Sequence, residues 1–302
     1  MTEFWQALGD PDIRFLRYTL IIGLMASLAF GVVGSYVVVH RITAIAGAIA
    51  HCVLAGIGAA LYSQRALGWE WFHPMFGALA AALVAAYLLG LVSLHAKERE
   101  DTAIGALWAI GMAIGLLFLA RTPGYVDPMS YLFGNILIIG DREIWIVAAL
   151  DVLVLGVVFA NYRRFQALCF DPEFARLRGL SVERYYLLLL CLVALTVVLL
   201  VHVVGIVLAI ALLSIPAAIA GRLVRHLWQM MIVAALLCMV FVVGGLGVSY
   251  RWDLPTGPTI ALGAGIVYTV VFVIAARRRA GRRGPPTQDV AAGEAGAGSR
   301  GA

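Results

Sequence analysis

The chain has 302 residues, of which 63% are hydrophobic and only 13% charged, and its formal net charge is +5 at pH 7. This composition excludes a soluble globular domain, in which about a quarter of the residues are charged. The basic residues cluster in loops between apolar runs, so the positive charge does not indicate a nucleic-acid-binding protein. The four cysteines are scattered (Cys52, Cys169, Cys191 and Cys238) and predict neither a disulfide framework nor a cysteine metal site.

Apolar runs of about 20 residues, the length that crosses a bilayer as a helix, predict an all-α polytopic membrane protein. We expect a polar lead at 1–12, a transmembrane domain at 13–276 and a basic, disordered cytoplasmic tail at 277–302. Nine spans are expected, or eight if one weak segment is re-entrant. The runs lie at about 13–39, 42–62, 75–95, 103–120, 144–162, 185–221 (two spans separated at Gly205, with Pro216 in the second), 227–248 and 259–276, and Asp101 and Thr102 are candidate N-caps of the fourth.

Positive charge is distributed unequally between alternate loops. The loops around residues 41, 97–99, 163–184, 222–225 and 277–283 hold most of the basic residues, whereas the alternate loops hold Arg65, Arg121, Arg142 and Arg251. Cytoplasmic loops carry the excess of lysine and arginine. The pattern predicts a multi-pass protein of the cell (inner) membrane with an extracytoplasmic N-terminus and a cytoplasmic C-terminus.

The second run, Ile42–Tyr62, is rich in glycine and alanine and carries His51 near its middle. Small residues let helices approach closely in lipid, so this helix is predicted to be buried among others. An ionisable side chain at membrane depth indicates a functional site. The alternative is a neutral imidazole that only joins two helices. Asp151, inside the fifth span, has the same two interpretations.

Two further polar residues are candidates nearer the outer surface. His202, close to the outer end of its span, is either part of an outer gate or an interfacial histidine. Asp253, in an outer loop, either contacts an extracytoplasmic binding protein or caps a helix, and the same holds for Asp127.

Residues 170–179, FDPEFARLRG, carry the signals of a short helix within the long polar loop 163–184. Asp171 suits the N-cap, Pro172 the first helical position and Gly179 a left-handed helix end. The predicted helix of about two turns lies on the cytoplasmic side. Such a rigid element would transmit force from a soluble partner, whereas the alternative is an ordinary surface loop.

Six segments follow one another along the chain: RITAIAGAIAHCVLAGIG (Arg41–Gly58), EDTAIGA (Glu100–Ala106), YLFGNIL (Tyr131–Leu137), the FD…A…G segment (Phe170, Asp171, Ala175 and Gly179), VGIVLAIALLSIPAAIA (Val204–Ala220) and DLPTGPTI (Asp253–Ile260). Together they resemble the ABC-3 family of metal permeases, the membrane subunits of zinc, manganese and iron ABC importers. The resemblance covers about residues 15–275.

This resemblance implies a type II-like ABC importer permease fold with eight to nine transmembrane helices. It implies a cytoplasmic ABC ATPase coupled through Phe170, Asp171, Ala175 and Gly179. An extracytoplasmic solute-binding protein and a second permease copy, either identical or paired, are the other expected partners in the lipid membrane. The expected cargo is Zn, Mn or Fe, with no permanently bound cofactor and no catalytic residue.

The chain departs from the family pattern at one position. The family segment usually has an aspartate four residues before the histidine, whereas this chain has Gly47. Residues four apart lie on one helix face, so the family pair would share an ion in transit. Here His51 is retained alone, and Asp151 is a candidate source of the missing carboxylate.

Two other functions compete with this reading. A secondary transporter or channel without a dedicated ATPase would explain the spans, His51 and Asp151 but not the capped helix. An intramembrane metalloprotease would need a motif such as HExxH, which the sequence lacks. The single lysine, Lys97, follows SLHA and not a glycine-rich turn, so the chain carries no P-loop and ATP hydrolysis is expected in a separate partner.

Overall fold

A computed structural model describes residues 14–95, 100–124, 126–134 and 141–280. Among these residues, eight helices are long and apolar enough to cross a membrane, and a ninth span results if the bent pair α7–α8 is counted as one. The helices are α2 (Arg14–Val39), α3 (Thr43–Leu67), α4 (Pro74–His95), α5 (Glu100–Arg121), α6 (Pro128–Phe133), α7 (Asp141–Ala160), α8 (Tyr162–Phe170), α9 (Pro172–Leu177), α10 (Val182–Val204), α11 (Ile206–Leu223), α12 (Leu227–Trp252) and α13 (Thr256–Ala280). The polytopic, all-helical fold is confirmed.

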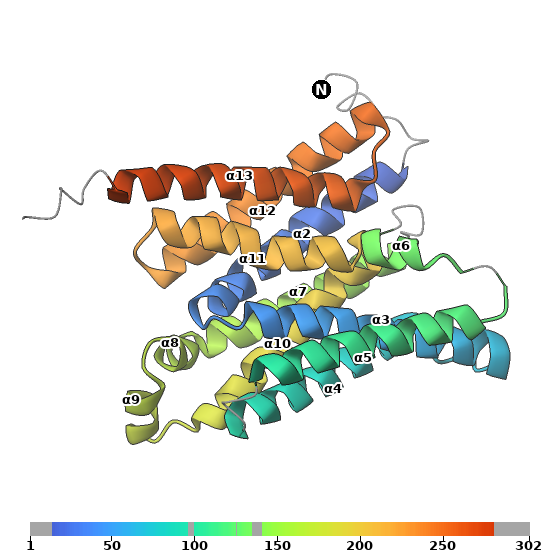
Figure 1. The fold of residues 1–302 in the computed structure, drawn as a ribbon, viewed down its shortest axis with the longest axis horizontal. Helices are drawn as coiled ribbons and strands as arrows, with labels where there is room; N and C mark the ends of the chain where they lie inside the picture. Colours follow the sequence, from blue (N-terminus) through green and yellow to red (C-terminus); the bar gives the residue numbers. More distant parts are fainter. Residues whose placement is uncertain (1–13, 96–99, 125, 135–140, 281–302) are drawn as a thin grey trace, which may run out of the picture.

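The helices pack in two groups that α10 joins (Figure 1). In one group α3 packs against α4 and α5, and in the other α2 packs against α11 and α12, with α13 on α11 and α12. Helix α10 contacts α4 and α3 on one side and α2 on the other. Helix α3 is the most enclosed, with 83% of its apolar span buried against 22% for α5 and 11% for α13. The predicted burial of the His51 helix is therefore confirmed.

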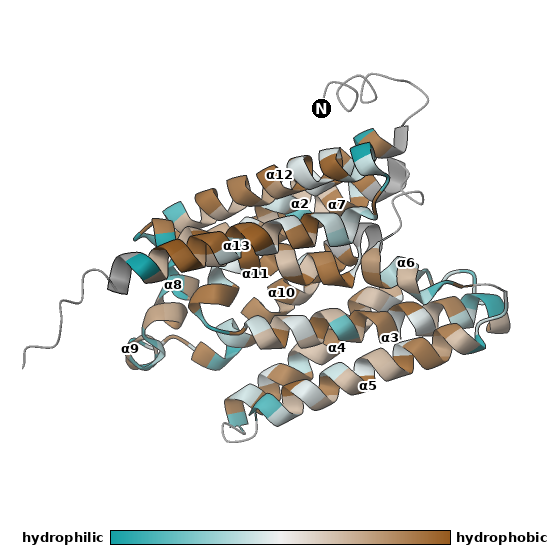
Figure 2. Cartoon of the chain, turned by 45° about the horizontal axis from the view of Figure 1, so that its top comes forward, coloured by the Kyte–Doolittle hydropathy of each residue, from teal (hydrophilic) through white to brown (hydrophobic). Residues whose placement is uncertain are grey.

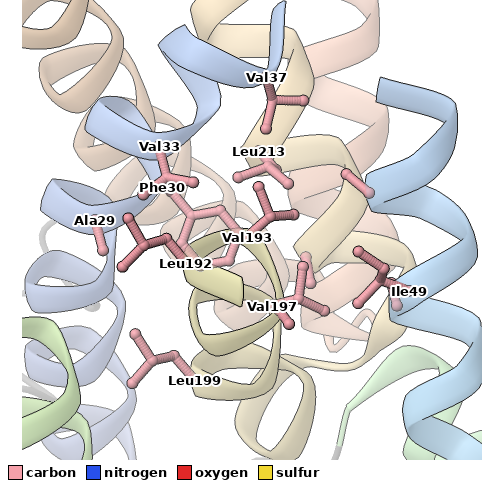
Figure 3. Close-up of a cluster of buried hydrophobic side chains, with 14 of the residues drawn as sticks. Ala29, Phe30, Val33, Val37, Ile49, Leu192, Val193, Val197, Leu199 and Leu213 are labelled. Carbon is pink, nitrogen blue, oxygen red and sulfur yellow. The ribbon is translucent and has the colours of Figure 1, made fainter. Parts of the chain in front are cut away.

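Figure 3 shows the apolar core where the two groups meet. Phe30 and Val33 of α2 lie next to Leu192 and Val193 of α10, and Ile49 of α3 reaches the same cluster. All five side chains are almost completely buried. Dispersion contacts in such a close-packed interior hold the helices together, because lipid tails are as apolar as these side chains.

Glycine sets the distance between α3 and α4. A Cβ atom added at Gly56 would lie 2.0 Å from the carbonyl oxygen of Gly77, and one added at Gly77 would lie 2.2 Å from the carbonyl oxygen of Gly56. The two backbones therefore touch, which only glycine permits. This contact helps to fix the position of α3, and with it His51, inside its three-helix group.

Gly205 separates α10 from α11, as predicted. Its φ of 88° is a conformation that glycine adopts without steric cost. A Cβ at this position would lie 2.4 Å from the backbone nitrogen of Gly134, just after α6. The break between the two spans thus packs against the end of α6. The first residues of the YLFGNIL motif form this end of α6. The rest of that motif, from residue 135, lies outside the described residues.

Three predicted boundaries are wrong. Helix α5 already begins at Glu100, so Asp101 and Thr102 lie in its first turn and do not cap it. The fifth span ends at Ala160, where the chain bends by 69° at Asn161 into α8. Much of the expected polar loop 163–184 is therefore helical, because Phe165 and Leu168 give α8 a buried face. Residues 277–280 continue α13, and the remainder of the tail and the lead 1–12 lie outside the described residues.

The ends of the bundle differ in composition. Helices α8 and α9, the α2–α3 turn and the last residues of α13 lie at one end, and α6 and the α12–α13 turn lie at the other (Figure 1). In Figure 2 most residues along the ribbons of α12 and α13 are hydrophobic, and hydrophilic residues lie mainly near helix ends. The described loops that are rich in arginine lie at the first end. We therefore expect this end to face the cytoplasm.

Candidate transport site and coupling helix

His51 lies in the middle of α3 and is buried, with 8% of its surface exposed. Its Nδ1 atom is enclosed and has no hydrogen-bond partner. A buried polar atom without a partner costs free energy, so its presence calls for an explanation such as a functional role. The Nδ1 atom therefore does not join α3 to a neighbouring helix through a hydrogen bond. It remains available as a ligand atom.

The indole of Trp108 on α5 stacks on the His51 imidazole. The ring centroids are 4.4 Å apart and the planes differ by 16°. The same indole lies over Gly47, because a Cβ atom added there would be 3.8 Å from Trp108 Cζ3. Trp108 thus covers the face of α3 on which positions 47 and 51 lie one turn apart.

Helix α5 is held on α3 next to this stack. The thiol of Cys52 donates a hydrogen bond to the carbonyl oxygen of Leu107, with Sγ and oxygen 3.3 Å apart. A Cβ atom at Gly111 would lie 2.6 Å from Cys52 Sγ, so α5 approaches closely there. All four cysteines are free thiols in the structure.

Asp151 is buried on α7, with 5% of its surface exposed, and its Oδ1 atom has no hydrogen-bond partner. However, α7 packs chiefly against α2 and α10, whereas His51 faces α5. Among the described residues, no group of three or more His, Cys, Asp or Glu side chains is placed to hold a metal ion. The structure therefore shows no contact that makes Asp151 a partner of His51.

The two outer candidates differ in what the structure describes. His202 falls in the last turn of α10, but its side chain lies outside the described part of the chain. Asp253 ends α12 in the left-handed conformation, with φ of 50°, and its backbone N–H donates to the Ser249 carbonyl. Asp127 caps α6 by accepting a hydrogen bond from the Met129 N–H, 3.0 Å away. Both acids thus have capping roles, and their contact with a binding protein stays a prediction.

The short helix predicted at 171–179 is present as α9. The Asp171 carboxylate accepts a hydrogen bond from the Phe174 N–H at 2.9 Å, and Pro172 is the first helical residue. At the other end, Gly179 has φ of 81°. Its N–H donates to the Arg176 carbonyl, and the Leu180 N–H donates to the Ala175 carbonyl, both at 3.0 Å. This pair of bonds is the Schellman motif, so the helix is fixed at both ends.

Helix α9 buries one residue and exposes several apolar ones. Ala175 is 3% exposed and anchors the helix, whereas Phe174 and Leu177 are 51% and 86% exposed. Phe170, the last residue of α8, is 64% exposed just before the Asp171 cap. The guanidinium of Arg178 lies 4.9 Å from the centre of the Phe174 ring. Exposed aromatic and aliphatic side chains beside arginine are typical of a protein-binding surface.

A polar cavity of about 640 Å³ lies between α9 and the ends of α2, α4, α5 and α10. On its wall Tyr186 donates a hydrogen bond to Ser93, 2.9 Å between oxygens, and Ser93 donates to Glu100 at 2.7 Å. His40 packs edge-on against Tyr186, with ring centroids 5.4 Å apart. Burial lowers the pKa of His40, and the nearby Glu100 carboxylate partly opposes this effect.

Trp108 and the Tyr186–Ser93–Glu100 chain were not predicted. Trp108 sits in an otherwise ordinary apolar span, and nothing in its spacing indicates that it meets His51. Ser93 and Tyr186 are 93 positions apart, so only the fold brings them together. The sequence marks Glu100 as an acidic residue at the start of a helix, but it does not indicate that Ser93 is its hydrogen-bond partner.

A polytopic helical bundle, with a buried mid-span histidine whose Nδ1 has no hydrogen-bond partner and a rigid capped helix at one end, has the features of an ABC transporter permease. The model of the ABC 3 transport family matches residues 12–276. The chain belongs to this family, and it is a permease subunit that carries out no ATP hydrolysis itself.

Several relatives support this assignment. The chain is 44% identical over 258 residues to an uncharacterized membrane protein of Synechocystis, covering 85% of this chain and 89% of that one. It is 38% identical over 279 residues to a "Probable metal transport system membrane protein" of Chlamydia pneumoniae, covering 92% and 95%. It is 29% identical over 279 residues to the manganese import system permease protein ScaB of Streptococcus parasanguinis, covering 92% and 96%.

Solved structures agree on the fold. The chain superimposes on the structure of PsaBC from Streptococcus pneumoniae in complex with Fab with a TM-score of 0.79 and 26% identity, covering 90% of this chain and 95% of that one. An inward-facing metal-chelate type ABC transporter gives a TM-score of 0.68 at 14% identity, covering 87% and 89%, and supports the fold alone.

Proposed function

We propose that this chain forms the membrane pathway of an ABC importer for divalent transition-metal ions, and that Mn²⁺ is its first candidate cargo, ahead of Zn²⁺ and Fe²⁺. The observation that carries the proposal is the buried His51 imidazole with an unpartnered nitrogen at mid-span. Neutral imidazole is a ligand for all three metals, so His51 alone does not choose between them. The permeases named for manganese among the relatives favour Mn²⁺.

The single imidazole also supports a second permease copy as a partner. One nitrogen cannot satisfy the coordination of a divalent metal ion, which takes four or more ligands. A two-fold symmetric pair of permeases would double every ligand that the chain supplies. Ions would then bind weakly and leave readily, which suits passage, and an extracytoplasmic binding protein would provide the selectivity. Asp151 remains a second candidate for the pathway.

Energy for import would enter through α9. Phe174 and Leu177 are exposed apolar side chains on a helix capped by Asp171 and Gly179, and Phe170 at the end of α8 extends this apolar surface. We place the cytoplasmic ABC ATPase on this surface. The arginine-rich loops at the same end of the bundle support a cytoplasmic position for it and for the C-terminus.

The test is Mn²⁺ uptake into proteoliposomes that contain the permease, its ATPase and its binding protein. The variant His51→Ala is expected to lose uptake while assembly and basal ATP hydrolysis stay normal. The matched control is His226→Ala, because His226 is exposed at the start of α12. Unchanged uptake in His51→Ala would remove His51 from the pathway and make Asp151 the next residue to change.

A secondary transporter or channel is the other candidate, and the same preparation separates the two. Uptake that proceeds without the ATPase and follows a proton or sodium gradient would favour it. Uptake that requires ATP inside the vesicle excludes it.

A further inference from the structure

We propose that Trp108 is the gating residue of the His51 site: its stacked indole locks the imidazole in a closed orientation, and the site opens when α5 withdraws the indole. The inference rests on the proposed passage of metal ions at His51. It adds a residue, and a moving element, that the sequence alone did not indicate.

The stack holds the imidazole in an orientation in which its Nδ1 atom is closed to an ion. A metal ion approaches an imidazole nitrogen in the plane of the ring, and in this structure Nδ1 is enclosed by protein. The indole lies parallel to the ring at 4.4 Å and prevents it from turning. The proposed opening step is therefore a turn of the imidazole that brings Nδ1 out of this enclosure, and the ring turns only after the stack has separated.

Gly47 makes room for this arrangement. The edge of the indole lies over Gly47, where a Cβ atom would be 3.8 Å from Cζ3, an ordinary contact distance. Alanine therefore fits at position 47. A longer side chain directed along the same face would meet the indole, so the indole and a carboxylate at position 47 compete for one space.

Helix α5 is joined to the described bundle along one face, where it packs closely on α3, and its other face is free. Only 22% of its apolar span is buried, and Trp108 itself is 38% exposed. On the outward face Ile110 and Leu117 are 54% and 67% exposed. The helix is attached to its neighbours mainly through α3. Its first residue, Glu100, is tied through Ser93 to Tyr186 beside the α9 cavity, so a displacement that starts near α9 has a hydrogen-bonded connection to α5.

The first test measures ion passage without ATP through the permease–ATPase complex in proteoliposomes, with Mn²⁺ as the probe. Trp108→Ala is expected to raise this uncoupled flux by roughly three- to tenfold, the range that corresponds to the loss of one aromatic contact. The matched control is Leu117→Ala, which removes another exposed side chain from α5. If Trp108→Ala does not assemble, Trp108→Leu decides, since it keeps apolar volume but has no ring to stack.

The second test reports on the site without transport. Cys52 follows His51, and its thiol bonds to Leu107, the neighbour of Trp108. In a background with Cys169, Cys191 and Cys238 replaced by serine, a small maleimide should alkylate Cys52 faster in the Trp108 variants than in the parent. Wild-type rates of both alkylation and uncoupled flux in Trp108→Leu would overturn the proposal.

A double variant tests the competition at position 47. Gly47→Ala should transport normally, whereas Gly47→Asp should lose uptake because the carboxylate and the indole clash. Gly47→Asp combined with Trp108→Ala should recover uptake and favour Mn²⁺ over Zn²⁺, because a carboxylate oxygen suits the harder ion. No recovery in the double variant would contradict the idea that the indole and the carboxylate occupy the same space.

Failure of the gate proposal can be told from failure of the transport-site proposal. If only the gate proposal is wrong, His51→Ala abolishes uptake while the Trp108 variants behave as the parent. If the transport-site proposal is wrong, His51→Ala transports normally.

Discussion

The Tyr186 hydroxyl on α10 donates a hydrogen bond of 2.9 Å to Ser93 on α4, and the Ser93 hydroxyl in turn donates one to Glu100 at the start of α5. The consecutive helices α4 and α5 and the distant helix α10 therefore share one hydrogen-bonded chain on the wall of the cavity beside α9. Removing one member of such a chain leaves its partner without a hydrogen bond, which costs free energy in a partly buried site.

The change Tyr186→Phe should weaken this junction. It removes the hydroxyl and leaves Ser93 without its donor, and the net loss expected for one such bond is about 1 kcal/mol of the free energy of unfolding. The measurement is the melting temperature in detergent, followed with a thiol-reactive dye. Tyr185→Phe, which removes a hydroxyl from the neighbouring residue, serves as the control, and equal melting temperatures for the two variants would contradict the prediction.

The left-handed backbone at position 179 should be essential for the shape of α9. Only residues that adopt this conformation at small cost should be accepted there. Gly179→Pro is expected to abolish ATP-driven uptake while the protein still inserts, because proline fixes φ near −65° and removes the N–H that bonds Arg176. Gly179→Asn should retain most uptake, since asparagine enters the left-handed region at small cost. The two variants are compared by ATPase co-purification and by Mn²⁺ uptake, and full uptake in Gly179→Pro would disprove the coupling role of α9.

Acid should destabilise the protein in part through His40. Burial lowers the pKa of His40 below its usual 6.5, so the folded protein holds this proton less tightly than the unfolded chain does. The corresponding stability is complete above pH 6.5 and is lost as pH falls through the folded-state pKa. Glu100 opposes the shift, and His95, Arg41, Arg176 and Glu183 line the same cavity.

The expected result is a smaller fall in melting temperature between pH 7.5 and about pH 5 in His40→Gln than in the parent protein. His73→Gln, in the α3–α4 loop, is the control for histidine loss in general. A parallel fall in all three proteins would show that His40 contributes nothing to the acid sensitivity.

Gly56 should not accept a methyl group. The added Cβ would overlap the Gly77 carbonyl, so Gly56→Ala must push α3 and α4 apart, with a cost of about 1–3 kcal/mol. The control is Gly105→Ala on α5, where a Cβ meets no atom within 4 Å and alanine favours the helix. Thermal unfolding of the two variants in detergent should move in opposite directions, and a neutral Gly56→Ala would contradict the close packing.

The two ends of the bundle should be labelled from opposite sides of the membrane. A cysteine at Leu177 on α9, 86% exposed, is expected to resist a membrane-impermeant maleimide in intact cells, whereas a cysteine at Trp71 in the α3–α4 loop, 72% exposed, should react. Both are introduced into a background without native cysteines. The reverse pattern would overturn the orientation derived from the arginine-rich loops.

The spans were predictable because lipid imposes their length and their apolar character on the sequence, and α9 was predictable because Asp171, Pro172 and Gly179 each carry a local backbone preference. Gly205 was recognisable for the same reason. The bend at Asn161 was not, since a helix that continues at 69° needs no glycine or proline to mark it. His51 could be selected as an ionisable group in an apolar helix, but Trp108 could not, because its importance comes from a contact 57 positions away that depends on how α5 lies on α3.

The bend at Asn161 makes α8 a lever arm. Asn161 sits at the pivot, where its side-chain amide donates to the Val157 carbonyl and accepts from Arg164, each at 2.9 Å. The nine residues of α8 extend about 13 Å, so a swing of about 10° at the pivot moves α9 by about 2 Å. Phe165, on this arm, packs against Tyr36 of α2 with ring centroids 5.5 Å apart. If the proposed ATPase pulls on α9, the Phe165–Tyr36 contact would carry the displacement to α2, and through α2 to the helix group formed with α11 and α12.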